Sequence, residues 1–142
     1  ACELAASRQA AYAQRLLALR QSLEDGLSSL GAVLFSRAAE RLPNTVYFAL
    51  PQIDGETLVG HLDRAGYAVA SGAACSSSQP EPSHVLQAIG VEPELARGAI
   101  RVSLGADNTA ADVAGLLSTL HATINQLRNL PAMSPSALAA VH

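Results

Sequence analysis

A strand, a helix and a second strand follow one another within residues 45–70, and this alternation restricts the chain to a layered fold. Residues 45–50 are rich in β-branched and aromatic side chains, which are typical of a strand. Asp54 can cap a helix over residues 55–65, and residues 67–70 read as the next strand. A layered α/β or α+β unit is the architecture that buries both kinds of element.

A leucine stripe predicts a long first helix over residues 5–30. Strong helix formers dominate this segment, and leucines recur at three- and four-residue steps: Leu16, Leu19, Leu23, Leu27 and Leu30. Arg20 and Glu24 fall off that stripe, and Gly31 can end the helix. Two interpretations stay open: the helix packs on its own sheet, or it bridges to another domain or a dimer partner.

A further strand and a last helix complete the pattern. Apolar and polar residues alternate over residues 100–104, which is typical of a strand. This alternation places Arg101 and Ser103 on the face opposite Ile100, Val102 and Leu104. Thr109 and Asp112 form a capping-box-like start for a helix that runs to about residue 130. Residues 32–36 are a short strand candidate.

We therefore expect an α+β fold in which a small three- to four-stranded sheet is covered by the first and last helices. Its main strands are residues 45–50, 67–70 and 99–104. The predicted domain organisation is a long bridging helix over residues 1–31, a small domain over 32–130 and a loose tail over 131–142.

The totals exclude several classes of protein. Hydrophobic residues make up 49% of the 142 residues, which is typical of a globular domain. The net charge is −3 without a basic cluster, so we expect no nucleic-acid partner, and no apolar run is long enough to span a membrane. Two cysteines make neither a disulfide framework nor a metal site, and with no signal peptide visible they favour the cytoplasm.

The only methionine is Met133, so we expect either a removed initiator or a domain cut from a longer protein.

Cys75 is the first candidate for chemistry. It sits among small, polar residues in segment 71–84, where a reactive thiol needs an accessible and adaptable backbone, and we expect residues 72–81 to be mobile. The alternative is a loop that happens to contain cysteine. His84 is the only nearby base, although a solvent-facing residue in the first turn of a helix is the commoner interpretation.

Arg101 is the second candidate, because its guanidinium can grip a carboxylate with two parallel hydrogen bonds. A surface ion pair is the alternative. Together, a thiol and a carboxylate clamp suggest an amino-acid substrate. All nine basic residues are arginine, so the chain has no lysine side chain that could form a Schiff base with a carbonyl cofactor.

Several motifs give the chain a family resemblance. The strongest are Ser-Gly-Ala-Ala-Cys-Ser-Ser at residues 71–77, Glu-Pro-Ser-His at 81–84 and Ile-Arg-Val-Ser-Leu-Gly at 100–105. With Leu-Pro-Asn-Thr at 42–45 and Asp-Gly-Glu at 54–56, they make residues 41–130 resemble the C-terminal small domain of NifS-like cysteine desulfurases. These are pyridoxal-phosphate enzymes of the class V aminotransferase group, and the α+β fold is the one that this resemblance implies.

The resemblance implies that Cys75 is the nucleophile that takes sulfur from L-cysteine as a persulfide and releases alanine. It implies that Arg101 anchors the substrate carboxylate, that an iron–sulfur scaffold or another protein accepts the sulfur, and that the complete enzyme is a homodimer. The cofactor would be pyridoxal phosphate in that enzyme, but this chain lacks the Schiff-base lysine. We therefore expect it to bind no cofactor covalently, to hold no metal and to be inactive by itself.

The sequence departs from the family pattern at Ala70 and Ala73, where serine is common, and at His84, where tyrosine is common. The tail, residues 131–142, also differs from the usual C-terminal ending of the family. Two other classes of function stay open: a stand-alone sulfur-carrier or interaction module that uses Cys75 without cofactor chemistry, and an inactive scaffold that keeps only the fold.

Overall fold

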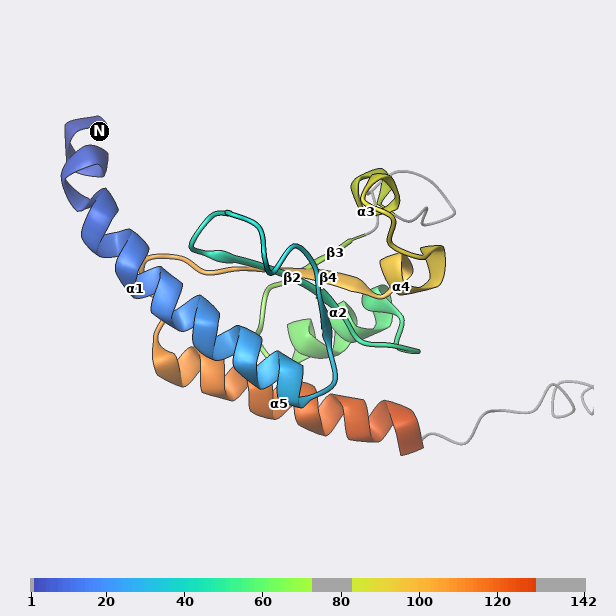
Figure 1. Ribbon diagram of the computed structural model, residues 1–142. Coiled ribbons are helices and arrows are strands. Elements are labelled where there is room, and N and C mark those ends of the chain that lie inside the picture. The colour runs from blue at the N-terminus through green and yellow to red at the C-terminus, as the bar shows by residue number, and fades with distance from the viewer. Residues whose placement is uncertain (1, 73–82, 130–142) are drawn as a thin grey trace, which may run out of the picture.

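A four-stranded antiparallel sheet with helices packed against it forms the protein (Figure 1). The computed structural model describes residues 2–72 and 83–129, and the side chains of residues 2–8 and 10 fall outside that description. In chain order the elements are α1 (Cys2–Ser29), β1 (Val33–Leu34), β2 (Thr45–Ala49), α2 (Gly55–Arg64), β3 (Ala70–Ser71), α3 (His84–Ala88), α4 (Pro93–Arg97), β4 (Ala99–Ser103) and α5 (Ala110–Asn129).

The strands are ordered β1-β2-β4-β3, so the two longest strands lie at the centre. The β2–β4 register pairs Val46 with Val102 and Phe48 with Ile100, and all four side chains are buried. The alternation expected for residues 100–104 is therefore confirmed, and it assigns one sheet face to the core.

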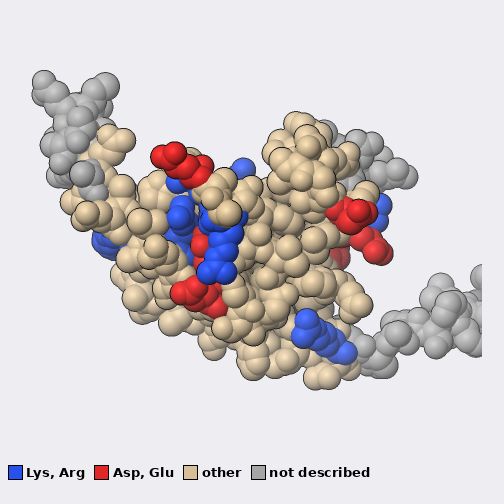
Figure 2. All heavy atoms as spheres, viewed as in Figure 1, with Lys and Arg blue, Asp and Glu red and all other residues tan. Residues whose placement is uncertain are grey.

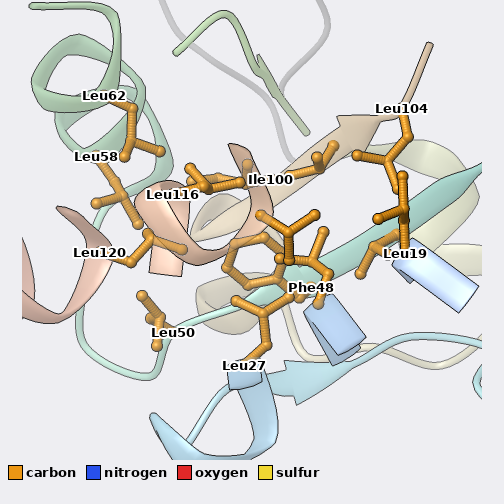
Figure 3. Close-up of a cluster of buried hydrophobic side chains, with 14 of the residues drawn as sticks. Leu19, Leu27, Phe48, Leu50, Leu58, Leu62, Ile100, Leu104, Leu116 and Leu120 are labelled. Atoms are coloured by element: carbon orange, nitrogen blue, oxygen red, sulfur yellow. The ribbon is translucent and has the colours of Figure 1, made fainter. Parts of the chain in front are cut away.

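The core fills the space between that sheet face and three helices, α1, α2 and α5 (Figure 3). Figure 1 shows α1 and α5 lying along each other on the same side of the sheet. The most buried large members of this core are Leu23, Leu27, Phe48, Leu50, Leu58, Leu62, Ile100 and Leu120. The predicted leucine stripe of the first helix thus packs on the chain's own sheet.

Both predicted helix starts are confirmed. The backbone N–H of Thr57 donates to Asp54 Oδ1 at 2.8 Å, which caps α2. The N–H of Thr109 donates to Asp112 Oδ2 at 2.8 Å, and the N–H of Asp112 donates to Thr109 Oγ1 at 3.3 Å, which closes a capping box on α5.

The strand predicted over residues 67–70 is much shorter than expected and is displaced along the chain. Only Ala70 and Ser71 pair with β4. The N–H of Tyr67 instead donates to the carbonyl of Leu62 at 2.9 Å, which closes the C-terminal end of α2 and holds this segment away from β4. The candidate over 32–36 is likewise reduced to β1, since Ser36 has a φ of 54° and turns the chain.

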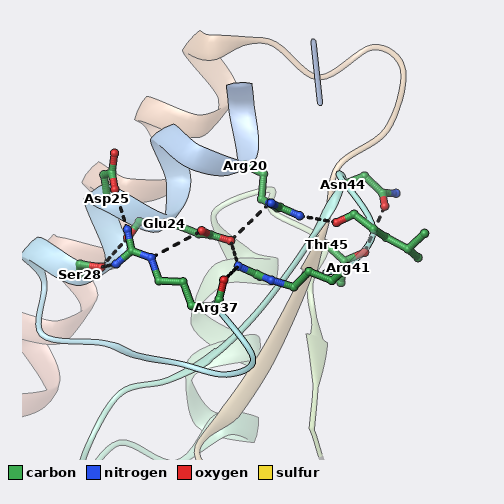
Figure 4. Close-up of polar contacts among 9 residues, drawn as sticks. Arg20, Glu24, Asp25, Ser28, Arg37, Arg41, Asn44 and Thr45 are labelled. Atoms are coloured by element: carbon green, nitrogen blue, oxygen red, sulfur yellow. Dashed lines mark hydrogen bonds and ion pairs between the residues drawn. The ribbon is translucent and has the colours of Figure 1, made fainter. Parts of the chain in front are cut away.

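Glu24 was expected outside the apolar stripe, yet it is only 4% exposed. Its carboxylate forms ion pairs with three arginines (Figure 4): Arg20 at 3.5 Å, Arg41 at 2.8 Å and Arg37 at 3.9 Å. Arg37 also pairs with Asp25 at 3.0 Å. A buried carboxylate is tolerated here because cations surround it, one from α1 itself and two from the segment between β1 and β2.

Candidate active site

The sheet face opposite the core carries Arg101. Because Val46–Val102 and Phe48–Ile100 face the core, their neighbours Tyr47 and Arg101 are paired on the other face. Ala70 of β3 pairs with Arg101 from the other side. A small second cluster around Ala49, Ala99 and the short helices α3 and α4 covers only one end of this face. Among the described residues, Arg101 is not part of this cluster.

Arg101 is exposed, and it forms no ion pair with any carboxylate in residues 2–72 and 83–129. Two other exposed arginines do have described partners: Arg15 donates to the carbonyl of Ala106 at 2.9 Å, and Arg37 binds Asp25. An arginine on a central strand, without a described acidic partner, can bind an anion such as a carboxylate with both guanidinium arms.

Cys75 lies outside the described residues, and so do residues 73–81 of the segment 72–81 for which mobility is expected. The residues on either side of that segment are described. Before it, Gly72 donates its N–H to the carbonyl of Ala99 at 2.7 Å. Cys75 follows Gly72 by three positions in the sequence.

His84 is the first residue of α3 and is exposed. This placement agrees with the interpretation of a solvent-facing residue at a helix start. Leu86, two residues later, is buried in the second cluster with Phe35 and Ala96. That contact fixes α3, and with it the point at which the chain returns from the cysteine segment.

Sequence reasoning missed a contact at the start of this segment. The hydroxyl of Ser71 donates to Glu56 Oε1 of α2 at 2.5 Å. The two residues are fifteen positions apart, so no local pattern links them. The motif Asp-Gly-Glu at residues 54–56 was a signal of the family only, and it did not indicate which residue Glu56 would contact.

Two hollows are described in the surface, and Arg101 lines neither of them. One of about 410 Å³ lies between the β2–α2 turn and the end of α5, where Asp54 and Arg128 line it. Another of about 510 Å³ lies beside Tyr67, Ser103 and Asp112. Figure 2 shows basic and acidic side chains interspersed on the face in view. Arg20 and Arg37 both form ion pairs with Glu24.

Within the described ranges there is no group of acidic, histidine or cysteine side chains that could hold a metal ion, and no helix there has the length and apolarity to cross a membrane.

Comparison with known proteins gives consistent matches. The model of the aminotransferase class-V family matches residues 3–116. A cysteine desulfurase of Rhodobacter capsulatus is 41% identical over 132 residues, which cover 92% of this chain and 34% of that protein. The cysteine desulfurase IscS of Methanosarcina thermophila is 38% identical, with 95% and 34% covered. The chain thus spans about a third of the length of these relatives.

Solved structures agree. A NifS-like protein has a TM-score of 0.76 at 32% identity, covering 87% of this chain and 31% of that one. The NifS-like protein of Rickettsia africae has the same TM-score at 26% identity, covering 86% and 31%. The expected α+β fold is thereby confirmed.

Proposed function

This chain belongs to the aminotransferase class-V family, and from that premise we propose that it is the small domain of a cysteine desulfurase and carries the sulfur-accepting thiol, Cys75. One observation carries the proposal. An exposed arginine without a described acidic partner, Arg101, lies on the sheet beside the strand from which the chain leaves toward Cys75. The identity of 41% and 38% to proteins named cysteine desulfurase supports the same proposal.

In the proposed reaction, the Cys75 thiolate attacks the sulfur of L-cysteine. A sulfur–sulfur bond forms as the carbon–sulfur bond of the substrate breaks, and the β-carbon keeps the bonding electron pair and takes up a proton. The sum is Cys75–SH plus L-cysteine giving Cys75–S–SH plus L-alanine, which balances in atoms and electrons. The thiol sulfur is oxidised and the β-carbon is reduced, so no external oxidant is needed.

Arg101 is proposed to bind the α-carboxylate of the substrate. Its place on a central strand limits the movement of its Cα, since β4 pairs with a neighbour on each side. A guanidinium fixed in this way selects amino acids by a bidentate contact and orients the side-chain sulfur relative to the segment that holds Cys75.

The residues of this chain do not fit covalent attachment of pyridoxal phosphate, because none of its nine basic residues is lysine. When bound in the complete enzyme, the cofactor would supply the electron sink that weakens the carbon–sulfur bond. Its lysine would have to come from outside these 142 residues. We further propose a homodimeric, cytoplasmic enzyme that passes sulfur to an acceptor such as an iron–sulfur scaffold protein, with residues 1–31 bridging to the cofactor domain and residues 131–142 as its tail.

The test is Cys75→Ser in the complete enzyme, with alanine release and protein-bound persulfide measured in a single turnover. We expect both to fall to background, because a serine hydroxyl is essentially un-ionised at neutral pH. Cys2→Ser is the matched control and should react as the wild type does. Persulfide formation at the wild-type rate in Cys75→Ser would contradict the proposal, and persulfide on the isolated chain without cofactor would favour the sulfur-carrier alternative.

A further inference from the structure

Three elements meet at the carbonyl group of Ala99, the first residue of β4. The N–H of Gly72 donates to it at 2.7 Å. From the other direction comes α2: a Cβ added at Gly55 would lie 3.1 Å from the same oxygen and 2.8 Å from the carbonyl oxygen of Arg97. Gly55 therefore allows the start of α2 to lie directly against the main chain of β4.

Side chains of β2 and β4 also pack closely against Gly72. A Cβ added there would lie 2.6 Å from the hydroxyl oxygen of Tyr47 and 2.7 Å from the Cβ of Ala99. Tyr47 belongs to β2, on the far side of β4, so its ring reaches across Ala99 to touch the main chain at Gly72. Phe35 packs edge-on against that ring, with centroids 5.5 Å apart, and helps to keep it in place.

One polar contact completes this junction. Because α2 begins against β4, its second residue, Glu56, lies beside β3 and accepts a hydrogen bond from the Ser71 hydroxyl at 2.5 Å. This bond to a carboxylate is charge-assisted. It is the last described side-chain contact before the chain leaves the sheet toward Cys75.

We propose that Glu56 is a positioning residue for sulfur transfer: through Ser71 it fixes the point and direction at which the main chain leaves the sheet toward Cys75. This inference rests on the proposed function. Cys75 follows Gly72 by only three positions, so a displacement of the main chain at Gly72 shifts the point from which the segment that holds the thiol begins. Glu56 does not touch the substrate, whereas Arg101 would hold it.

The first measurement uses the 142-residue chain and needs no activity. We expect Glu56→Ala to raise the amide exchange rate of Gly72 by about threefold to tenfold, since a charge-assisted hydrogen bond between partly exposed groups is weakened by solvent. Glu56→Gln retains an acceptor oxygen and should restore most of the protection. Glu94→Ala is the matched control, because Glu94 is also an exposed acid in the first turn of a helix, α4.

The second measurement uses the complete enzyme. Glu56→Ala should lower the single-turnover rate of persulfide formation by about threefold to tenfold while KM for cysteine stays unchanged, and Ser71→Ala should give the same loss without adding to it. If Glu56 served only the overall stability of the fold, Glu56→Ala would change both the rate of persulfide formation and KM for cysteine. In that case Glu56→Gln would not restore the rate selectively. An unchanged rate, a changed KM, or an equal loss in Glu94→Ala overturns the inference.

Failure of the proposed function has a different signature. In that case Cys75→Ser would keep its sulfur transfer, whereas the exchange rate of Gly72 would still report whether Glu56 holds the start of the segment. If Gly72 exchanges at the same rate in Glu56→Ala and in the wild type, the positioning role is wrong whatever Cys75 does.

Discussion

Arg41 Nη2 lies 2.8 Å from Oε1 of Glu24, a carboxylate on α1 that is only 4% exposed. Arg41 belongs to the segment between β1 and β2, so this ion pair ties that segment to the long helix (Figure 4). Arg20 pairs with the same oxygen at 3.5 Å. One carboxylate is thus the counter-charge shared by two arginines whose side chains are 12% and 17% exposed.

Glu24→Gln should therefore be strongly destabilising, because it leaves two poorly solvated cations without a counter-charge. We expect the free energy of unfolding to fall by about 2–4 kcal/mol, somewhat less than for a fully buried pair. Asp25→Asn is the matched control: its side chain is 73% exposed, and its loss should cost less than about 0.5 kcal/mol. Urea denaturation of both variants measures this, and equal effects would contradict the argument.

Two glycines of the same helix should respond in opposite directions to alanine. Gly60 lies within α2, and the atom nearest to a Cβ added there is Arg64 Nη1 at 3.8 Å. Gly60→Ala should therefore raise the free energy of unfolding by about 0.5–1 kcal/mol. Gly55→Ala should destabilise by about 1–3 kcal/mol, since its Cβ would meet backbone carbonyls that cannot rotate away. Thermal unfolding of the two variants should show shifts of opposite sign.

The pKa of the Asp112 carboxyl is lowered from its ordinary value, first because the backbone N–H of Thr109 donates to it and then because the Thr109 side chain does. A carboxyl whose pKa is lower in the folded state stabilises the fold above the unfolded pKa, near 4, and loses this contribution as pH falls through the folded value. The stability difference between wild type and Asp112→Asn should thus be full at pH 6 and shrink below about pH 4. A difference that grows on acidification would contradict the capping role.

Arg101→Ala in the complete enzyme should raise KM for cysteine by more than about tenfold, because a charge-assisted contact to the carboxylate is worth about 1.5–3 kcal/mol. Arg64→Ala removes an exposed arginine from α2 and is the control, with KM expected to stay at the wild-type value. The defect differs from that of Cys75→Ser, which should leave cysteine binding intact. If KM is unaffected in Arg101→Ala, the anchor lies elsewhere.

The isolated chain should form no side-chain adduct with pyridoxal phosphate on borohydride reduction, because it contains no lysine. Its N-terminal amine is the one group that could react. Peptide mapping by mass spectrometry distinguishes the two cases, and a reduced adduct on any side chain would show that the cofactor assignment is wrong.

Local rules in the sequence determined much of the fold. The Asp54 cap, the capping box of Thr109 and Asp112, and the alternation along β4 each depend on residues a few positions apart. Such features follow from helix and strand geometry alone, which is why they could be predicted. The residue types of the candidate site, a thiol at Cys75 and a guanidinium at Arg101, were also visible in the sequence, and their roles remain proposals.

The tertiary structure decided what depends on distant partners. Residues 67–69 have a strand-like composition, but Tyr67 bonds to the end of α2 instead of β4, and no pattern within the segment distinguishes these outcomes. Glu24 is buried because Arg37 and Arg41, thirteen and seventeen positions away, close over it. In the same way, only packing of α2 against β4 brings Glu56 to Ser71, since a short sequence pattern carries no information about which remote backbone will lie within hydrogen-bond reach.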